Sequence, residues 1–259
     1  MMTPPGEIFA RSRGFLTGFA LAVTFLTTLP IAKPSCNAGR LADGAWAFPL
    51  VGAGIGALAG FIFLLAQVLR LGDWLAALLA VLAGIVLTGA LHEDGLADTA
   101  DGLIGGRDRD HALAIMRDSR NGTFGVLAIV LSVLLRAAAL VGIADAAQVG
   151  LALIAAHAAS RAALPIAMRA MMPARSEGLG ASAGRPHAAF AVLAGTIGTL
   201  ISLAALDPRR GAMALGIFAA AVFGAGLLAR RRIGGYTGDI LGAFQQIGEI
   251  AMLLTAAAR

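Results

Sequence analysis

The sequence has few charged residues, few aromatic residues and almost no cysteine, and each shortage excludes a class of protein. Charged residues make up 14% of the 259 residues and aromatic residues 6%, whereas hydrophobic residues make up 58%. A soluble domain needs more polar side chains to cover its surface, and a disordered chain has far fewer apolar ones. Cys36 is the single cysteine, so a disulfide scaffold within the chain is excluded as well. These numbers predict a helical protein embedded in a membrane.

The net charge of +5 does not point to a nucleic-acid partner. Nearly all of the 20 basic residues are arginines, and they lie mostly between the apolar segments. No basic cluster lies on a soluble domain, and the aromatic residues do not alternate with basic ones. We therefore expect membrane lipid, and no nucleic acid, as a partner.

Eight apolar segments are candidate membrane-spanning helices, since a bilayer core takes about 20 residues per helix. They are residues 14–31, 45–69, 74–91, 123–143, 149–172, 188–206, 212–229 and 240–258. Pro30 interrupts the first segment, and Glu249 with two glutamines weakens the last, so six to eight segments cross completely. The sequence thus predicts an all-α, polytopic integral membrane bundle that forms one domain over residues 1–259. Its many glycines permit close helix packing and association into a homo-oligomer.

The long connection 92–122 is acidic and holds seven of the 15 acidic residues. With eight spans, the face that carries this loop has eleven arginines and lysines, and the opposite face has six. Because basic residues are enriched on the cytoplasmic side, the loop is predicted to face the cytoplasm and both termini the outside. Four spans separate this loop from Asp239, so the two share a face however the first span is counted.

The first motif with chemical content is the segment 92–102, HEDGLADTADG. Asp94, Asp98 and Asp101 are spaced i, i+4 and i+7, which places them on one face of a helix. Stacked carboxylates repel one another unless a hard cation neutralises them, and Mg²⁺ binds through carboxylates together with substrate phosphates. The spacing predicts a Mg²⁺–diphosphate site at the end of the third span. A solvated acidic loop is the alternative.

The second motif, residues 117–125 (RDSRNGTFG), leads into the fourth span after a short amphipathic stretch, 108–117. Asn121 or Thr123 can cap that helix. Free backbone N–H groups at a helix start, with Gly122 for close approach and arginines nearby, suit a phosphate. A plain helix cap with interfacial arginines explains the same residues.

The third motif, residues 234–243 (GGYTGDILGA), places Asp239 at the start of the last span. An acid there also interacts favourably with the helix dipole. Its location on the same face as the first motif favours a shared metal site.

Three arginines and one histidine lie within predicted spans: Arg136, His157, Arg161 and Arg169. Such residues are costly at membrane depth and usually face the bundle interior. Arg161 and His157, four residues apart, are placed to reach a phosphate or an acidic-motif carboxylate, and a structural ion pair is the alternative. The chain has no Gly-x-Ser-x-Gly motif, no Cys–His pair and no zinc spacing, so phosphoryl transfer is favoured over nucleophilic triads.

At this point the sequence resembles the cobalamin synthase family of adenosylcobinamide-GDP ribazoletransferases. The resemblance covers nearly the whole chain and rests on segments 25–30 (FLTTLP), 92–102, 115–125 (IMRDSRNGTFG) and 234–243. It implies an enzyme of the cell inner membrane that acts late in cobalamin synthesis. Such an enzyme joins adenosylcobinamide-GDP to α-ribazole, or to its 5′-phosphate, and releases GMP with the help of Mg²⁺ or Mn²⁺.

The resemblance also implies roles for individual residues. It assigns the metal–diphosphate site to Asp94, Asp98, Asp101 and Asp239. Arg120 is the expected phosphate contact, with Ser119, Asn121 and Gly122 of the same motif as further substrate contacts. Arg161 is added as a candidate substrate contact because of its position within a span, not because of the resemblance. The general base is left open between Asp118 and His92.

Three other classes share parts of this pattern. A CDP-alcohol phosphotransferase also uses several Asp residues and Mg²⁺, but its motif has Arg where Asp98 follows Ala97 here, and Asp101 comes too early. A prenyltransferase would carry several Asp residues in its second motif, which here has one. A transporter or channel would carry its acids deep within the spans, whereas these cluster in one loop.

Overall fold

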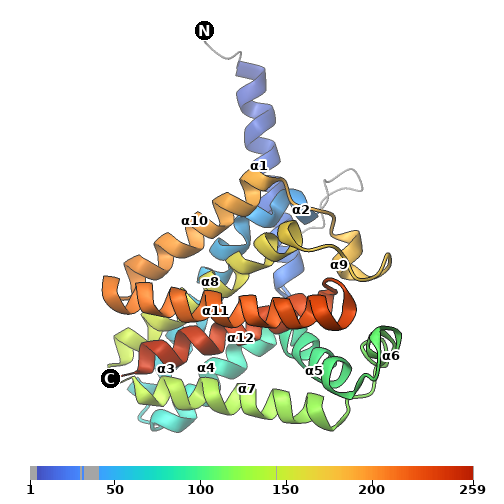
Figure 1. Ribbon diagram of the computed structural model, residues 1–259. Helices are drawn as coiled ribbons and strands as arrows, with labels where there is room; N and C mark the ends of the chain where they lie inside the picture. The colour runs from blue at the N-terminus through green and yellow to red at the C-terminus, as the bar shows by residue number, and fades with distance from the viewer. Residues whose placement is uncertain (1–4, 30, 32–40, 144, 259) are drawn as a thin grey trace.

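The protein is a bundle of α-helices in a computed structural model that describes residues 5–29, 31, 41–143 and 145–258, with the backbone alone for 5–13 and 179 (Figure 1). Within these residues there is no β-strand, and the single β-bridge pairs Pro173 with Tyr236. The helices are α1 (Pro5–Leu26), α2 (Leu41–Gly44), α3 (Phe48–Val68), α4 (Asp73–Thr88), α5 (Leu91–Gly105), α6 (Arg109–Ile115), α7 (Thr123–Gly142), α8 (Ala146–Ala170), α9 (Leu179–Ser182), α10 (Ala188–Ala205), α11 (Pro208–Ile233) and α12 (Gly238–Ala257).

Six helical segments of the described chain are long and apolar enough to cross a membrane. They are Leu41–Val68, Thr123–Gly142, Ala146–Ala170, Ala188–Ala205, Pro208–Ile233 and Gly238–Ala257. This confirms the polytopic helical bundle and the lower bound of six spans. The last segment forms a complete helix despite its polar residues, because these side chains are buried inside the bundle rather than exposed to lipid.

The two remaining candidate spans are shorter than the sequence suggested. The span predicted at 14–31 ends as a helix at Leu26, and its Pro30 lies outside the described residues. The span predicted at 74–91 becomes α4, which has 16 residues and ends at Gly89, where φ is +62°. At about 1.5 Å per residue, α4 is shorter than a hydrocarbon core of about 30 Å. A bend of 91° then leads into α5, so we treat α5 as a helix at the end of the bundle rather than as part of a span.

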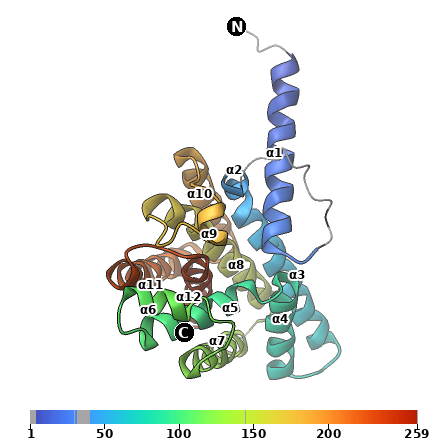
Figure 2. The ribbon, with the colours of Figure 1, turned by 90° about the vertical axis from the view of Figure 1, so that its right-hand side faces the viewer.

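Helix α12 is the centre of the bundle and packs against α5, α7, α8 and α11. Figure 2 views the molecule along these helices and shows α1 rising away from them. Small residues allow close contacts elsewhere, as between α3 and α8, where a Cβ on Gly56 would lie 2.7 Å from Cα of Ile154. This contact fits the expectation that glycine allows membrane helices to pack closely.

Large apolar side chains point outward from the helices, as expected for a lipid-facing surface. On α7, Val126, Leu127, Val130, Leu131 and Leu134 are each about half exposed. The bundle therefore combines an apolar exterior with polar groups in its interior, which is the arrangement that a membrane helix bundle requires.

One end of the bundle gathers the segments predicted to carry chemistry. Helices α5, α6 and α9 lie there together with the turn between α11 and α12, whereas the last turn of α12 lies at the opposite end (Figure 1). The prediction that the 92–122 segment and Asp239 share a face is confirmed, since Gly95 of α5 packs directly on Asp239. Much of the predicted loop is helical, as α5 and α6.

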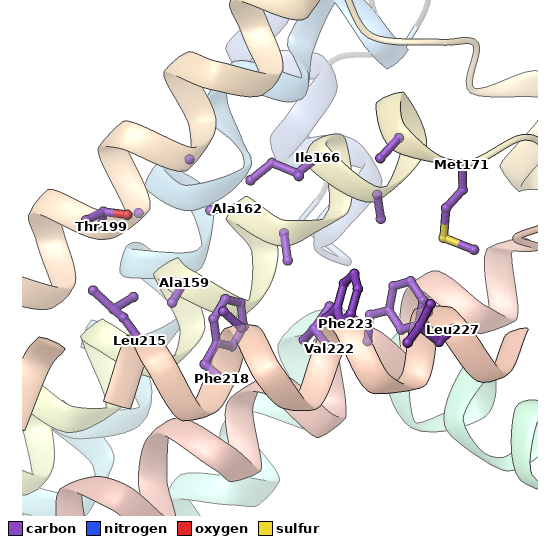
Figure 3. A pocket seen from close by; sticks show the side chains of 18 of the residues that line it. Ala159, Ala162, Ile166, Met171, Thr199, Leu215, Phe218, Val222, Phe223 and Leu227 are labelled. Atoms are coloured by element: carbon purple, nitrogen blue, oxygen red, sulfur yellow. The ribbon is translucent and has the colours of Figure 1, made fainter. Parts of the chain in front are cut away.

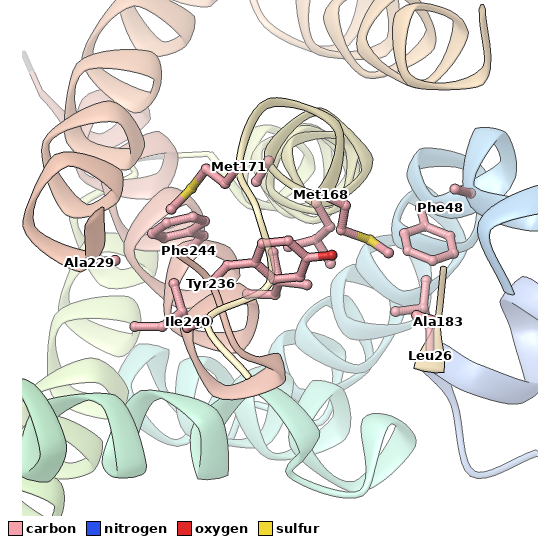
Figure 4. Close-up of a cluster of buried hydrophobic side chains, with 14 of the residues drawn as sticks. Leu26, Phe48, Met168, Met171, Ala183, Ala229, Tyr236, Ile240 and Phe244 are labelled. Carbon is pink, nitrogen blue, oxygen red and sulfur yellow. The ribbon is translucent and has the colours of Figure 1, made fainter. Parts of the chain in front are cut away.

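A cluster of buried apolar side chains supports this end from within (Figure 4). Tyr236 lies among Met168, Ile240 and Phe244, and its hydroxyl donates to the carbonyl of Gly180 at 3.4 Å. The turn before α12 is therefore fixed by packing on both sides, and this determines where α12 begins.

Candidate functional site

Asp94 of α5 faces the start of α12 across a small cavity. The cavity has a volume of about 140 Å³, and its lining includes His92, Asp94, Arg175 and Asp239. Helices α5 and α12 approach closely because Gly95 has no side chain, as a Cβ there would lie 2.8 Å from the carbonyl oxygen of Asp239. The structure thus brings together two motifs that lie more than a hundred residues apart in the chain.

Electrostatics indicate that these carboxylates crowd one another. Partial burial and, after it, the neighbouring charges of Asp94, Asp239 and Asp101 together raise the pKa of Asp98 to about 7, against a smaller opposing effect of Arg175. The crowded anions favour either a proton or a cation at this position.

Asp239 is held in place by its own turn and by one arginine. Thr237 Oγ1 accepts from the Ile240 N–H at 3.2 Å, which caps α12, and donates to Asp239 Oδ2 at 3.1 Å. Arg175 Nη2 donates to the same oxygen at 3.2 Å. These contacts direct the carboxylate of Asp239 toward α5.

Sequence reasoning counted Arg175 only as a loop charge and missed its role in the site. Two backbone bonds attach its segment to the turn before α12: Tyr236 N–H donates to the Met172 carbonyl at 3.0 Å, and Ala174 N–H to the Tyr236 carbonyl at 2.8 Å. Arg109 donates to the Ala174 carbonyl at 2.6 Å. The only signal in the sequence was an arginine just beyond a span on the acidic face, which does not reveal a partner.

Asp101 was expected from its spacing to bind a metal ion, but in the structure it binds backbone N–H groups. Its two carboxylate oxygens accept from the N–H groups of Gly122 at 2.7 Å and Gly125 at 2.9 Å. Asp101 therefore caps α7 from the neighbouring helix. The expectation that Asn121 or Thr123 caps this helix is wrong, and the Gly122 N–H that was expected to bind phosphate already has a partner. The other two aspartates of this face of α5, Asp94 and Asp98, remain available to a ligand.

The remaining residues of the second motif lie on the surface. Arg120 donates to Asp118 through Nη2 at 2.6 Å and through Nε at 3.0 Å, and this pairing lowers the pKa of Asp118 to about 2. Such a weak base is poorly suited to accept a proton from a hydroxyl near neutral pH. Ser119 and Asn121 are exposed beside the pair.

Of two further residues singled out from the sequence, His92 lines the cavity and Arg161 lies in a buried polar network. His92 lies next to the cavity, is 2% exposed, and its Nδ1 has no hydrogen-bond partner within the described residues. Arg161 is 1% exposed and donates to His157, with Glu249 Oε2 3.9 Å away. Arg161 therefore belongs to a buried polar network and does not face the cavity, which corrects its expected place at a phosphate.

A larger cavity of about 310 Å³ between α8, α10 and α11 is apolar and lies away from the acids. Phe218, Val222 and Phe223 of α11 face Ala162 of α8 across it (Figure 3). It offers no group for acid–base or metal chemistry along these walls, so the smaller acidic cavity is the candidate active site.

The donor set of the acidic cavity suits a hard divalent cation. Among the described residues, no three His, Cys, Asp or Glu side chains stand close enough to form a complete metal site. Mg²⁺ does not need one, because it usually keeps water ligands and is held by one or two carboxylates together with substrate phosphates. The crowding that raises the pKa of Asp98 would be relieved by such an ion.

Fold and site together define an integral membrane protein with an acidic, arginine-bearing cavity at one end of its helix bundle. Comparison with known sequences gives the family. The family described as cobalamin-5-phosphate synthase matches residues 18–257 of the chain, and the chain belongs to this family.

Curated relatives agree with this assignment. A protein of Bradyrhizobium diazoefficiens is 47% identical over 248 residues, which cover 95% of both chains, and one of Azorhizobium caulinodans is 42% identical over 254 residues, covering 94% of this chain and 96% of the relative. A third, from Mesorhizobium japonicum, is 42% identical over 245 residues, or 94% of each chain. All three are named adenosylcobinamide-GDP ribazoletransferase. No solved structure matches the chain.

Proposed function

We propose that this protein joins adenosylcobinamide-GDP to α-ribazole, or to α-ribazole 5′-phosphate, and releases GMP. The names of its relatives support the substrates. The ribazole hydroxyl oxygen forms a bond to the phosphorus attached to cobinamide, the bond from that phosphorus to the GMP oxygen breaks, and the hydroxyl proton is lost. The observation that carries the proposal is the convergence of Asp94, Asp239 and Arg175 on one cavity, with Asp98 near enough for their charges to shift its pKa.

We propose that one or two of the carboxylates Asp94, Asp98 and Asp239 would hold Mg²⁺ together with the substrate phosphates, and that the bound ion would neutralise the diphosphate and stabilise the charge that develops on the leaving phosphate. Asp101 contributes by fixing the loop before α7, since both of its oxygens already accept backbone hydrogen bonds. The proposed ligand set thus differs from the sequence-based one in the role of Asp101.

The protein's own cations complete the phosphate site. Arg175 reaches the cavity beside Asp239 and is 16% exposed at its side chain, so it is placed to donate to a phosphate oxygen. Arg120 is exposed and paired with Asp118 at the surface, where we propose that it attracts the anionic substrate.

His92 is the proposed acceptor of the hydroxyl proton. It lines the cavity, and its Nδ1 has no partner among the described residues. Asp118 is disfavoured because its pKa is lowered to about 2. We also propose that the acidic end of the bundle faces the cytoplasm across the cell inner membrane, in accord with the distribution of arginines.

The test is a turnover assay on the purified protein in lipid nanodiscs. Adenosylcobinamide-GDP and Mg²⁺ are supplied with α-ribazole or its 5′-phosphate, and GMP and the cobalamin product are followed by chromatography. We expect both products in equal amounts, and none after EDTA is added until Mg²⁺ is restored. GMP release that does not require a ribazole substrate would show hydrolysis and contradict the proposed transfer.

A further inference from the structure

A buried polar network lies within the bundle next to the acidic cavity, and the proposed chemistry does not use it. It joins α5, α7, α8 and α12, and each member is at most 6% exposed. Its members are Glu93, Ser132, Arg136, His157, Ser160, Arg161, Gln245, Gln246 and Glu249. Charges in a membrane interior are costly unless paired, so a network of this size calls for an explanation.

Arg136 of α7 is shared between two carboxylates of different helices. Its Nη2 lies 3.0 Å from Glu93 Oε1 of α5, and its Nη1 lies 3.2 Å from Glu249 Oε1 of α12. Gln246 of α12 also donates to Glu93 Oε1, at 3.0 Å, and accepts from Ser132 of α7 at 2.6 Å. Glu93 is thereby attached to both helices that flank α5.

Glu93 lies between two pairs of α5 residues that line the cavity, Leu91 with His92 and Asp94 with Gly95. His92 and Asp94 line the cavity, whereas Glu93 points into the network. Because successive residues of an α-helix are about 100° apart, fixing the direction of Glu93 also fixes the rotation of the first turn and so the direction of Asp94.

This first turn needs an external anchor. It follows the 91° bend after α4, and Ala90 has a φ of +57°, a conformation that is unfavourable for a residue with a side chain. No side chain caps the start of α5. Contacts of Glu93 with α7 and α12 therefore supply the restraint that the local backbone lacks.

We propose that Glu93 is a positioning residue, which holds the first turn of α5 against α7 and α12 so that Asp94 and Asp98 face Asp239 and can bind a divalent cation together. The inference rests on the proposed function in one respect, that the acidic cavity is the metal–diphosphate site. Glu93 itself does not touch the substrate.

Glu249→Gln is the matched control for Glu93→Gln. Both substitutions remove one carboxylate charge from Arg136 and leave it the other carboxylate. Glu249 lies ten residues beyond Asp239, or about 15 Å along α12, and does not belong to α5. A general loss of stability affects both variants, whereas a loss of positioning affects only Glu93→Gln.

The readout is Mn²⁺ binding to the purified protein in nanodiscs, measured by electron paramagnetic resonance, with thermal unfolding in parallel. We expect Glu93→Gln to weaken Mn²⁺ binding about tenfold or more and Glu249→Gln to leave it within about twofold. Gln246→Met removes one bond to Glu93 without changing any charge, and we expect a smaller loss in the same direction. The double variant Glu93→Gln/Arg136→Met, which restores charge balance, regains thermal stability but not Mn²⁺ affinity.

Equal Mn²⁺ affinity in wild type, Glu93→Gln and Gln246→Met would overturn the proposal, as would equal losses in Glu93→Gln and Glu249→Gln. The proposed function fails separately. A wild-type protein that binds Mn²⁺ in a Glu93-dependent manner and releases no GMP would support positioning and contradict the transferase reaction.

Discussion

Arg175 and Asp239 are 64 residues apart in the chain, yet Nη2 of the arginine lies 3.2 Å from Oδ2 of the aspartate. The loop between α8 and α10 thus contributes a cation to a site otherwise built by α5 and α12. Its backbone is tied to the turn before α12 at Pro173 and Tyr236.

Replacing Arg175 tests whether this cation serves the substrate. We expect Arg175→Ala to lower kcat/KM about 100-fold, because a preorganised donor to a phosphate is lost, and Arg175→Lys to retain part of the activity, since it keeps the charge but not the planar fork. Steady-state GMP release measures this. Arg209→Ala, at the opposite end of the bundle, is the control and should behave as wild type. Full activity of Arg175→Ala would remove the arginine from the site.

A substitution at Gly95 tests whether the close contact between α5 and α12 is needed for activity. A Cβ at this position would lie 2.8 Å from the Asp239 carbonyl oxygen and 3.2 Å from Cα of Gly242, so Gly95→Ala forces the two helices apart. We expect activity to fall about tenfold or more, since small displacements of a site are costly. Gly54→Ala meets no atom within 4 Å and serves as the matched control. Comparable GMP release by the two variants would mean that the contact does not matter for the reaction.

Much of the fold and part of the site could be predicted from the sequence. Low charge and long apolar runs predict the membrane bundle, and counting spans predicts that the 92–122 segment and Asp239 share a face. Both inferences depend on properties of the local sequence. The bend after α4 was missed because it depends on Ala90 at a φ of +57°, which nothing in an apolar run signals.

The second limit of prediction from the sequence concerns side-chain contacts between distant helices. Periodicity places Asp101 on the same face as Asp94 but does not show that the N–H groups of Gly122 and Gly125 occupy it. The sequence pattern does not single out Glu93 and presents Glu249 as a residue that weakens the last span, whereas the structure places both against Arg136. The pairing of buried ions depends on helix packing, which one sequence does not specify.

Asp101→Ala separates capping from metal binding. The substitution leaves the buried Gly125 N–H without an acceptor, and the loss of a cap and of a buried hydrogen bond costs about 1–3 kcal/mol. We expect a lower Tm in thermal unfolding and Mn²⁺ affinity close to that of wild type. Asp118→Ala, which removes an exposed acid from the same region, should leave Tm unchanged. Loss of Mn²⁺ binding by Asp101→Ala with an unchanged Tm would restore Asp101 to the metal ligands.

The raised pKa of Asp98 predicts how cation binding depends on pH. Burial and the neighbouring carboxylates raise its pKa to about 7 in the metal-free protein, so below pH 7 a proton occupies the oxygen that a cation would use. Protonation competes with the metal, and the apparent affinity should therefore rise with pH, by about tenfold from pH 6 to pH 8, and level off above.

Mn²⁺ titrations at pH 6, 7 and 8 measure this dependence. In Asp98→Asn, affinity should be lower than in wild type at pH 8 and nearly independent of pH, because the titrating group is gone. Asp110→Asn is the control, since this exposed acid is paired with Arg109 on the outside of α6, and it should follow the wild-type profile. A pH dependence that survives in Asp98→Asn would assign the titration to another group. Because the raised pKa also means that the Asp98 carboxylate destabilises the metal-free fold above pH 4, Asp98→Asn should unfold at a higher temperature than wild type at pH 8 in EDTA.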